Sequence, residues 1–201
     1  MTDRLVDVSL TEWEDGIDLI LDTRVPLPPM QVWPHVTHSE LVEAWFVAYS
    51  SGEHEDQIVL ELDDQPVTAH VLSVEAPHSD EDTAHILLDI DGIGRLGLTL
   101  TPDPADAEEG SGRPGGTGRT DGTDPATADS GQIGTRIVLS HTFADPGVDH
   151  ALLAQVIPQV GPVWETHLRL LAGTLTRSPG AYDVPEELLT DRYEQIVREF
   201  A

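Results

Sequence analysis

Apolar residues that recur every third or fourth position predict a long helix late in the chain. Within residues 161–175 they form one stripe of an α-helix, at Trp164, Leu168, Leu171 and Leu175. Pro162 fits the first turn of this helix, where a missing N–H costs nothing. Glu165 and Arg169 face away from the stripe. An amphipathic helix that starts with a tryptophan needs a large apolar surface to pack against.

Most of the chain before this helix alternates between apolar and polar residues, which is the pattern of half-buried β-strands. It predicts strands over residues 17–25, 58–62, 67–75 and 135–143, and a hairpin over residues 84–101. Asp91–Gly92 is a favourable tight turn for that hairpin. Because each strand has one apolar face, we predict an α+β fold in which a curved antiparallel sheet wraps around the late helix.

Shorter helices are also predicted. Residues 30–36 form a helical stretch that Pro34 disturbs. Thr37 and Glu40 then have the spacing of a capping box. The helix that this box opens carries the apolar residues Leu41, Val42, Trp45 and Phe46. Residues 47–56 carry only a weak pattern.

Two further helical patterns flank the long helix. Residues 148–157 form a short helix that Pro158 interrupts. A last helix begins with Asp183 as its N-cap. Its apolar stripe consists of Leu189, Tyr193, Ile196 and Phe200.

A polar segment separates the last two predicted strands. Residues 102–133 contain seven glycines, four prolines and few apolar residues. Such a segment cannot bury enough apolar surface to offset the entropy lost on ordering. We therefore predict a disordered insertion. Its seven acids and two arginines give it a net charge of −5, so −22 of the chain's −27 lies elsewhere.

Composition excludes several classes of function. The chain has no cysteine, which excludes disulfides and thiolate chemistry. A surface this acidic repels phosphate backbones and anionic lipid, so we expect neither nucleic acid nor membrane as a partner. The N-terminal residues do not resemble a signal peptide, and the cytoplasm is the expected location.

Standard catalytic and metal-binding patterns are missing, and we assign no catalytic or metal-ligating residue. Nine histidines are present, but zinc needs three or four converging ligands, and nothing in the sequence brings them together. His141 has the parity of the apolar face of its strand. It is either a buried histidine with a satisfied hydrogen bond or a residue that contacts a ligand or moves a proton.

Three local patterns together resemble a known family. The first is an apolar pair, a threonine, a Glu-Leu pair and paired aromatics, in Val32, Trp33, Thr37, Glu40, Leu41, Trp45 and Phe46. The second is the strand 134–141, which ends in histidine, and the third is Gly161 followed by Trp164, Leu168 and Leu171. Their order resembles the SRPBCC (START-like) superfamily, specifically the homologues of the activator of heat-shock-protein-90 ATPase, over residues 15–176. Pro34 and the insertion at 102–133 depart from that pattern.

The resemblance implies a helix-grip fold, often with an apolar cavity between the sheet and the long C-terminal helix. Residues 15–176 would form this domain, and residues 183–201 would add one more helix to it. The residues expected to line the cavity are Trp45, Phe46, His70, Leu88, Leu98, Leu139, His141, Trp164 and Leu168.

Three classes of function remain open. The prediction is a non-enzymatic protein that binds a small hydrophobic molecule in the cavity, without a cofactor. The first alternative is a chaperone accessory whose acidic surface meets a basic partner. The second is a cavity enzyme of the cyclase or hydrolase type, with His141 or His70 as acid–base.

Added salt should stabilise the fold. Repulsion among the excess acids opposes compaction, and salt shortens its range from about 30 Å at 0.01 M to about 3 Å at 1 M. We expect the melting temperature to rise steadily with NaCl in a thermal denaturation series. An unchanged midpoint between 10 mM and 1 M would contradict this expectation.

Overall fold

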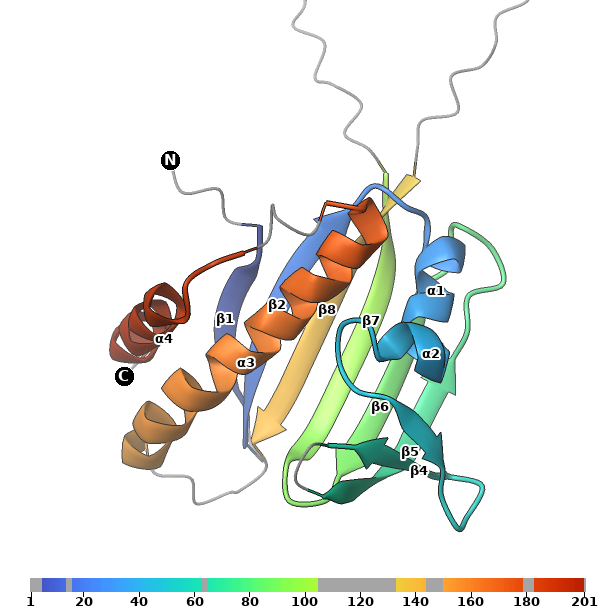
Figure 1. The fold of residues 1–201 in the computed structure, drawn as a ribbon. Helices are drawn as coiled ribbons and strands as arrows, with labels where there is room; N and C mark the ends of the chain where they lie inside the picture. The colour runs from blue at the N-terminus through green and yellow to red at the C-terminus, as the bar shows by residue number, and fades with distance from the viewer. Residues whose placement is uncertain are drawn as a thin grey trace, which may run out of the picture.

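An eight-stranded antiparallel sheet curves around a long helix in the computed structural model (Figure 1). The structure describes residues 5–13, 16–62, 65–104, 133–143, 150–178 and 183–200. The strands are β1 (Asp7–Trp13), β2 (Gly16–Val25), β3 (Tyr49–Ser51), β4 (Gln57–Glu61), β5 (Pro66–Glu75), β6 (Ala84–Ile90), β7 (Gly94–Pro104) and β8 (Ile133–Phe143). Their order across the sheet is β1-β2-β8-β7-β6-β5-β4-β3.

The predicted α+β architecture is confirmed. All predicted strands are present, and the predicted hairpin is β6–β7, with Gly92 in its turn at φ 73°. Two strands were not predicted. β1 extends the sheet beyond β2, and β3 is only three residues long, too short for alternation to reveal it.

The long helix α3 spans His150–Thr176 without interruption, so the prediction of two helices divided at Pro158 is wrong. Pro158 and Pro162 both lie inside it. Each removes one backbone hydrogen bond, but side chains on both sides of them are buried, Ile157 completely and Trp164 to 5% exposure. Tertiary packing therefore carries the helix through the prolines.

The second face of α3 is also buried, which corrects the prediction that Glu165 and Arg169 face away from the core. Glu165 is fully buried, and its Oε1 accepts hydrogen bonds from Arg169 Nε at 2.9 Å and from Arg192 Nη1 at 2.8 Å. Arg192 belongs to α4 (Glu186–Phe200), which packs against α3 (Figure 1). α4 thus hides a face of α3 that the sequence pattern marks as polar.

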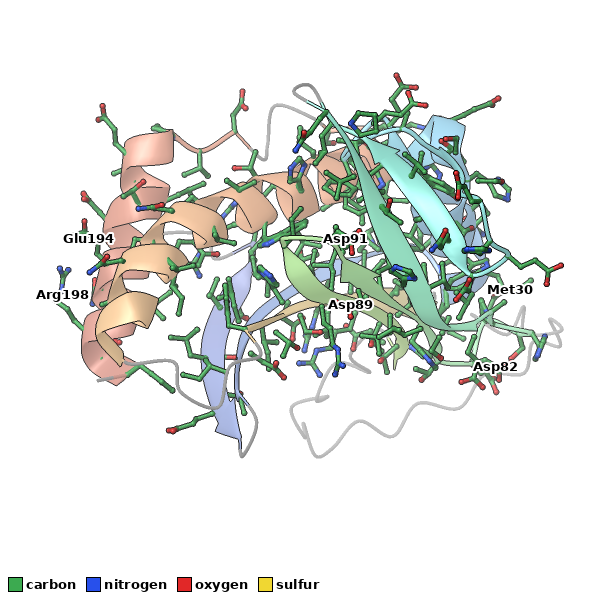
Figure 2. The ribbon with its side chains drawn as sticks, turned by 90° about the horizontal axis from the view of Figure 1, so that it is seen from below. Met30, Asp82, Asp89, Asp91, Glu194 and Arg198 are labelled. Atoms are coloured by element: carbon green, nitrogen blue, oxygen red, sulfur yellow. The ribbon has the colours of Figure 1, made fainter. Side chains whose placement is uncertain are left out.

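α4 presents an apolar side to α3 and a charged side to solvent. Leu189 and Tyr193 are buried, whereas Glu194 and Arg198 have largely exposed side chains (Figure 2). The helix begins after Pro185, whose carbonyl accepts the first hydrogen bonds, so the prediction of Asp183 as N-cap is wrong.

Two short helices cover the other half of the sheet. α1 (Pro29–Thr37) contains Pro34, and α2 (Ser39–Val42) follows almost at once. The predicted capping box is absent, because the Thr37 hydroxyl donates to Trp33 O instead and His38 is the N-cap of α2. The Ser39 hydroxyl donates to Tyr49 O at 2.6 Å and accepts from Tyr49 N at 2.8 Å, which ties α2 to β3.

The predicted disordered insertion falls almost entirely on residues 105–132, which are not described. Among the helices that the structure does describe, none combines the length and apolar character needed to cross a membrane.

Gly161→Ala should destabilise the protein. Glycine to alanine inside a helix normally stabilises by roughly 1 kcal/mol, but a Cβ at position 161 would overlap the Tyr193 ring of α4. We expect a loss of about 1–3 kcal/mol in chemical denaturation.

The control is the same change in a Tyr193→Ala background, where space for the new methyl group exists. There Gly161→Ala should be neutral or stabilising. A stabilising effect of Gly161→Ala in the unaltered protein would contradict the close packing of α4 on α3.

Candidate functional site

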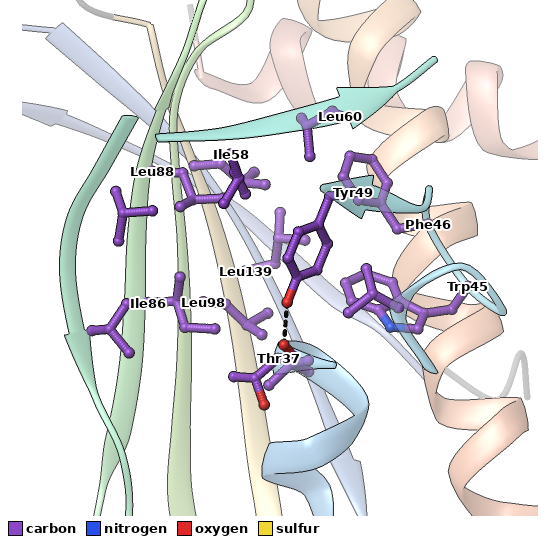
Figure 3. Close-up of a pocket in the computed structure, with 15 residues that line it drawn as sticks. Thr37, Trp45, Phe46, Tyr49, Ile58, Leu60, Ile86, Leu88, Leu98 and Leu139 are labelled. Carbon is purple, nitrogen blue, oxygen red and sulfur yellow. Dashed lines mark hydrogen bonds between the residues drawn. The ribbon is translucent and has the colours of Figure 1, made fainter. Parts of the chain in front are cut away.

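A cavity of about 250 Å³ lies between the inner face of the sheet and the segment that contains α1, α2 and β3 (Figure 3). Five strands, β4 to β8, supply one wall, and residues 36–49 supply the other. The lining residues are Val36, Thr37, Val42, Trp45, Phe46, Tyr49, Ile58, Leu60, Val71, Val74, Ile86, Leu88, Leu96, Leu98 and Leu139. One wall is aliphatic and the other is largely aromatic.

The aromatic wall is anchored to α3. The Phe46 ring lies 5.6 Å from the Trp164 ring and 5.1 Å, edge-on, from the His167 ring, centroid to centroid. His167 Nδ1 donates to Trp45 O at 2.7 Å, and burial lowers the pKa of His167. α3 therefore positions a wall of the cavity without lining it.

The polar groups of the lining residues are bonded within the protein. Trp45 Nε1 donates to His35 O at 2.8 Å, and the Thr37 hydroxyl donates to Trp33 O at 2.8 Å. The Tyr49 hydroxyl donates to Thr37 O (Figure 3). Burial raises the pKa of Tyr49, so the phenol stays protonated at neutral pH. None of the fifteen described lining residues carries a charge.

The lining of the cavity is most exposed at β5. Val74 is 53% exposed, whereas the other lining residues are buried or half-buried. A β-bulge between Val71 and Ser73 places Val71 and Val74 in the same lining although they are three residues apart. Strict alternation along this strand would have put them on opposite faces, and neither valine was among the predicted lining residues.

The structure brings five of the nine predicted site residues into the lining: Trp45, Phe46, Leu88, Leu98 and Leu139. Trp164 and Leu168 lie in the packed core behind the aromatic wall. His70 pairs with Asp89 beside the inward pair Ala69–Ile90, so alternation puts it on the outer face of the sheet. Tyr49, the one hydroxyl-bearing ring of the lining, falls in the weakly patterned segment 47–56 and was not predicted.

His141 is a buried histidine with both ring nitrogens bonded. Nε2 donates to Ile93 O at 2.9 Å, and Nδ1 accepts from Trp164 Nε1 at 3.0 Å. These bonds define the neutral Nε2–H tautomer. The side chain is 2% exposed, and burial lowers its pKa. Neither nitrogen is left for a molecule in the cavity.

A separate polar cluster lies on the outer face of the sheet. Ser73 Oγ is 2.7 Å from His85 Nε2, and His85 Nδ1 is 3.4 Å from Glu75 Oε2. The order is that of a hydrolase relay, but hydrolysis also needs a concave substrate site with oxyanion donors. The Glu75 side chain is 69% exposed, and the cavity lies on the other side of the sheet. We base no function on this cluster.

The described residues contain no cluster that could bind a metal ion. Within them, no three histidine, aspartate or glutamate side chains gather as metal ligands would.

The chain resembles several solved structures in its fold. No protein-family model matches the chain, and no curated protein matches it. Solved structures do match. CalU16 from Micromonospora echinospora is 15% identical, with a TM-score of 0.56 for its crystal structure over 96% of this chain and 98% of that one. Its solution structure gives 0.58 over the full length of both chains.

A conserved protein of unknown function from Enterococcus faecalis is 9% identical, with a TM-score of 0.60 over 97% of this chain and 92% of that one. This chain has the helix-grip fold. At such low identities the likeness concerns the fold alone.

The cavity of this helix-grip domain lies beside the long helix. The sequence pattern predicts a cavity directly between the sheet and α3, with Trp164 and Leu168 in its walls. Instead α3 packs closely on β2 and fills that side, and the space is left where α1, α2 and β3 span the other strands (Figure 1).

The buried histidines should make the fold sensitive to acid. Because burial lowers the pKa of His141, His167 and His35 in the folded state, the unfolded chain takes up protons first as the pH falls below about 6.5. Stability present at pH 8 is then lost, by at most about 1.4 kcal/mol per pH unit for each histidine. Denaturant titrations from pH 8 to 5 measure this slope.

His141→Gln should reduce the slope, because glutamine keeps a donor for Ile93 O and an acceptor for Trp164 but binds no proton. The matched control is His54→Gln at an exposed position. Equal slopes in the two variants would contradict the role of His141.

Proposed function

We propose that this helix-grip protein binds a small hydrophobic molecule in the cavity between its sheet and residues 36–49. The observation that carries the proposal is the cavity itself, about 250 Å³ of space lined by uncharged and largely apolar side chains. Preformed apolar concavities of about 300–1,000 Å³ are typical of small-molecule sites. At about 250 Å³ the cavity falls just below that range, which favours a small guest.

The polar groups around the cavity support binding over acid–base catalysis. A general acid or base must reach the reacting atom with a free proton or lone pair. His141 has both nitrogens occupied, and His70 is on the outer face. The cyclase or hydrolase alternative therefore has less support than ligand binding.

Membership of the family of heat-shock-protein-90 ATPase activator homologues is the finer part of the proposal. It is supported by the order of the three sequence patterns, from Trp33 through His141 to Trp164. A chaperone partner is supported only by that resemblance and by the acidic surface. Stimulation of chaperone ATPase activity by the purified protein would favour this alternative.

Filling the cavity should remove binding without unfolding the protein. Leu98 lines the cavity, and Leu98→Phe would place the larger ring in existing space. We expect a loss of stability below about 1 kcal/mol and the loss of any ligand-induced thermal shift. A screen of neutral aromatic and aliphatic compounds, and native mass spectrometry of the gently purified protein, supply the ligands.

Leu100→Phe is the matched control. Leu100 lies on the same strand and the same face, but it is fully buried in the core and does not line the cavity. Overpacking there should cost about 1–3 kcal/mol. If no compound binds, and Leu98→Phe is as destabilising as Leu100→Phe, the cavity does not exist in solution.

A further inference from the structure

The hydroxyl oxygens of Tyr49 and Thr37 are the side-chain atoms of the lining that can still hydrogen-bond to a guest. The Tyr49 hydroxyl donates its proton to Thr37 O, and because a hydroxyl has one proton and two acceptor lone pairs, its oxygen can still accept. The indole N–H of Trp45 and the hydroxyl of Thr37 are directed to backbone carbonyls of α1. A guest therefore meets hydroxyl acceptors and no free side-chain donor.

The cavity also lacks any compensation for charge. None of its fifteen lining residues is an arginine, lysine, aspartate or glutamate. A buried ion without a partner loses its hydration and gains nothing in return. The surroundings give no help to an anion either, since the whole chain carries −27.

We propose that the cavity selects uncharged guests that carry a single hydroxyl or N–H group, hydrogen-bonded to the Tyr49 oxygen, and that it rejects carboxylates and ammonium ions. This inference rests on the proposed function and narrows it to a chemical class. Shape and apolar burial supply the affinity, and the absence of any ion partner supplies the selectivity.

A charge series on one scaffold tests the selectivity. The probes are 1-naphthylmethanol, 1-naphthoate, 1-naphthylmethylammonium and 1-methylnaphthalene, with 1-octanol, octanoate and octylammonium as a flexible second series. Calorimetric titration at pH 8 should give the alcohol a Kd at least about a hundredfold lower than that of the carboxylate. The difference from the ammonium should be at least about tenfold, because roughly a tenth of that amine is neutral at pH 8.

The pH dependence distinguishes rejection of charge from rejection of shape. A carboxylic acid with a pKa near 4 loses its neutral form about tenfold for each pH unit above that value. If only the neutral acid enters, its observed Kd should rise about a hundredfold between pH 6 and pH 8. The Kd of the alcohol over the same range corrects for any change in the protein.

Tyr49→Phe tests the hydrogen bond. The alcohol should bind about two- to tenfold more weakly to this variant, as expected for one hydrogen bond. The affinity of 1-methylnaphthalene should not fall. A change in the shape of the cavity would weaken both guests alike, so the difference between them reports the hydroxyl.

The possible results distinguish failure of the proposed selectivity from failure of the proposed ligand-binding function. Naphthoate or octylammonium binding as tightly as the alcohol would overturn the selectivity while leaving a ligand-binding protein. Equal losses for alcohol and hydrocarbon in Tyr49→Phe would overturn the role of the hydroxyl. No binding by any neutral probe of either scaffold would overturn the proposed function itself.

Discussion

One helix cannot cover an eight-stranded sheet. Neighbouring strands lie about 4.8 Å apart, so eight of them extend over roughly 34 Å, whereas a helix with its side chains is about 10 Å wide. α3 packs on the half of the sheet that contains β2. The rest of the inner face must be covered by α1, α2 and the residues that follow them up to Tyr49, which include Trp45 and Phe46 (Figure 1). The cavity is the space that these short elements leave unfilled.

The long helix α3 contacts α4 on one side and the aromatic wall of the cavity on the other. On one side a buried carboxylate, Glu165, accepts hydrogen bonds from Arg169 and Arg192, which fixes α4 against the helix. A buried ion pair adds little net stability, but removing one partner is costly. On the other side Trp164 and His167 contact Phe46. The aromatic wall of the cavity is thus held by the same rigid helix that α4 supports.

A structural feature could be predicted from the sequence where the residues that determine it are close together in the chain. Alternation identified most strands because burial of one face repeats every two residues. The bulge at Val71, the continuity of α3 through Pro158 and the burial of Glu165 depend on partners that are distant in sequence. The cavity was harder still to predict from the sequence. It is the space left between two packed surfaces, and its position depends on side chains such as Tyr49 that no local pattern marks.

The charged residues of this protein lie outside the cavity lining. The excess of acids, −27 in all, accompanies a cavity whose lining residues carry no charge. Net charge far from zero favours solubility, and an uncharged cavity relies on the non-directional burial of apolar surface. Such burial discriminates weakly among apolar guests of similar size. Discrimination therefore has to come from what the cavity cannot compensate, and an ion without a partner is penalised far more strongly than a misplaced methyl group.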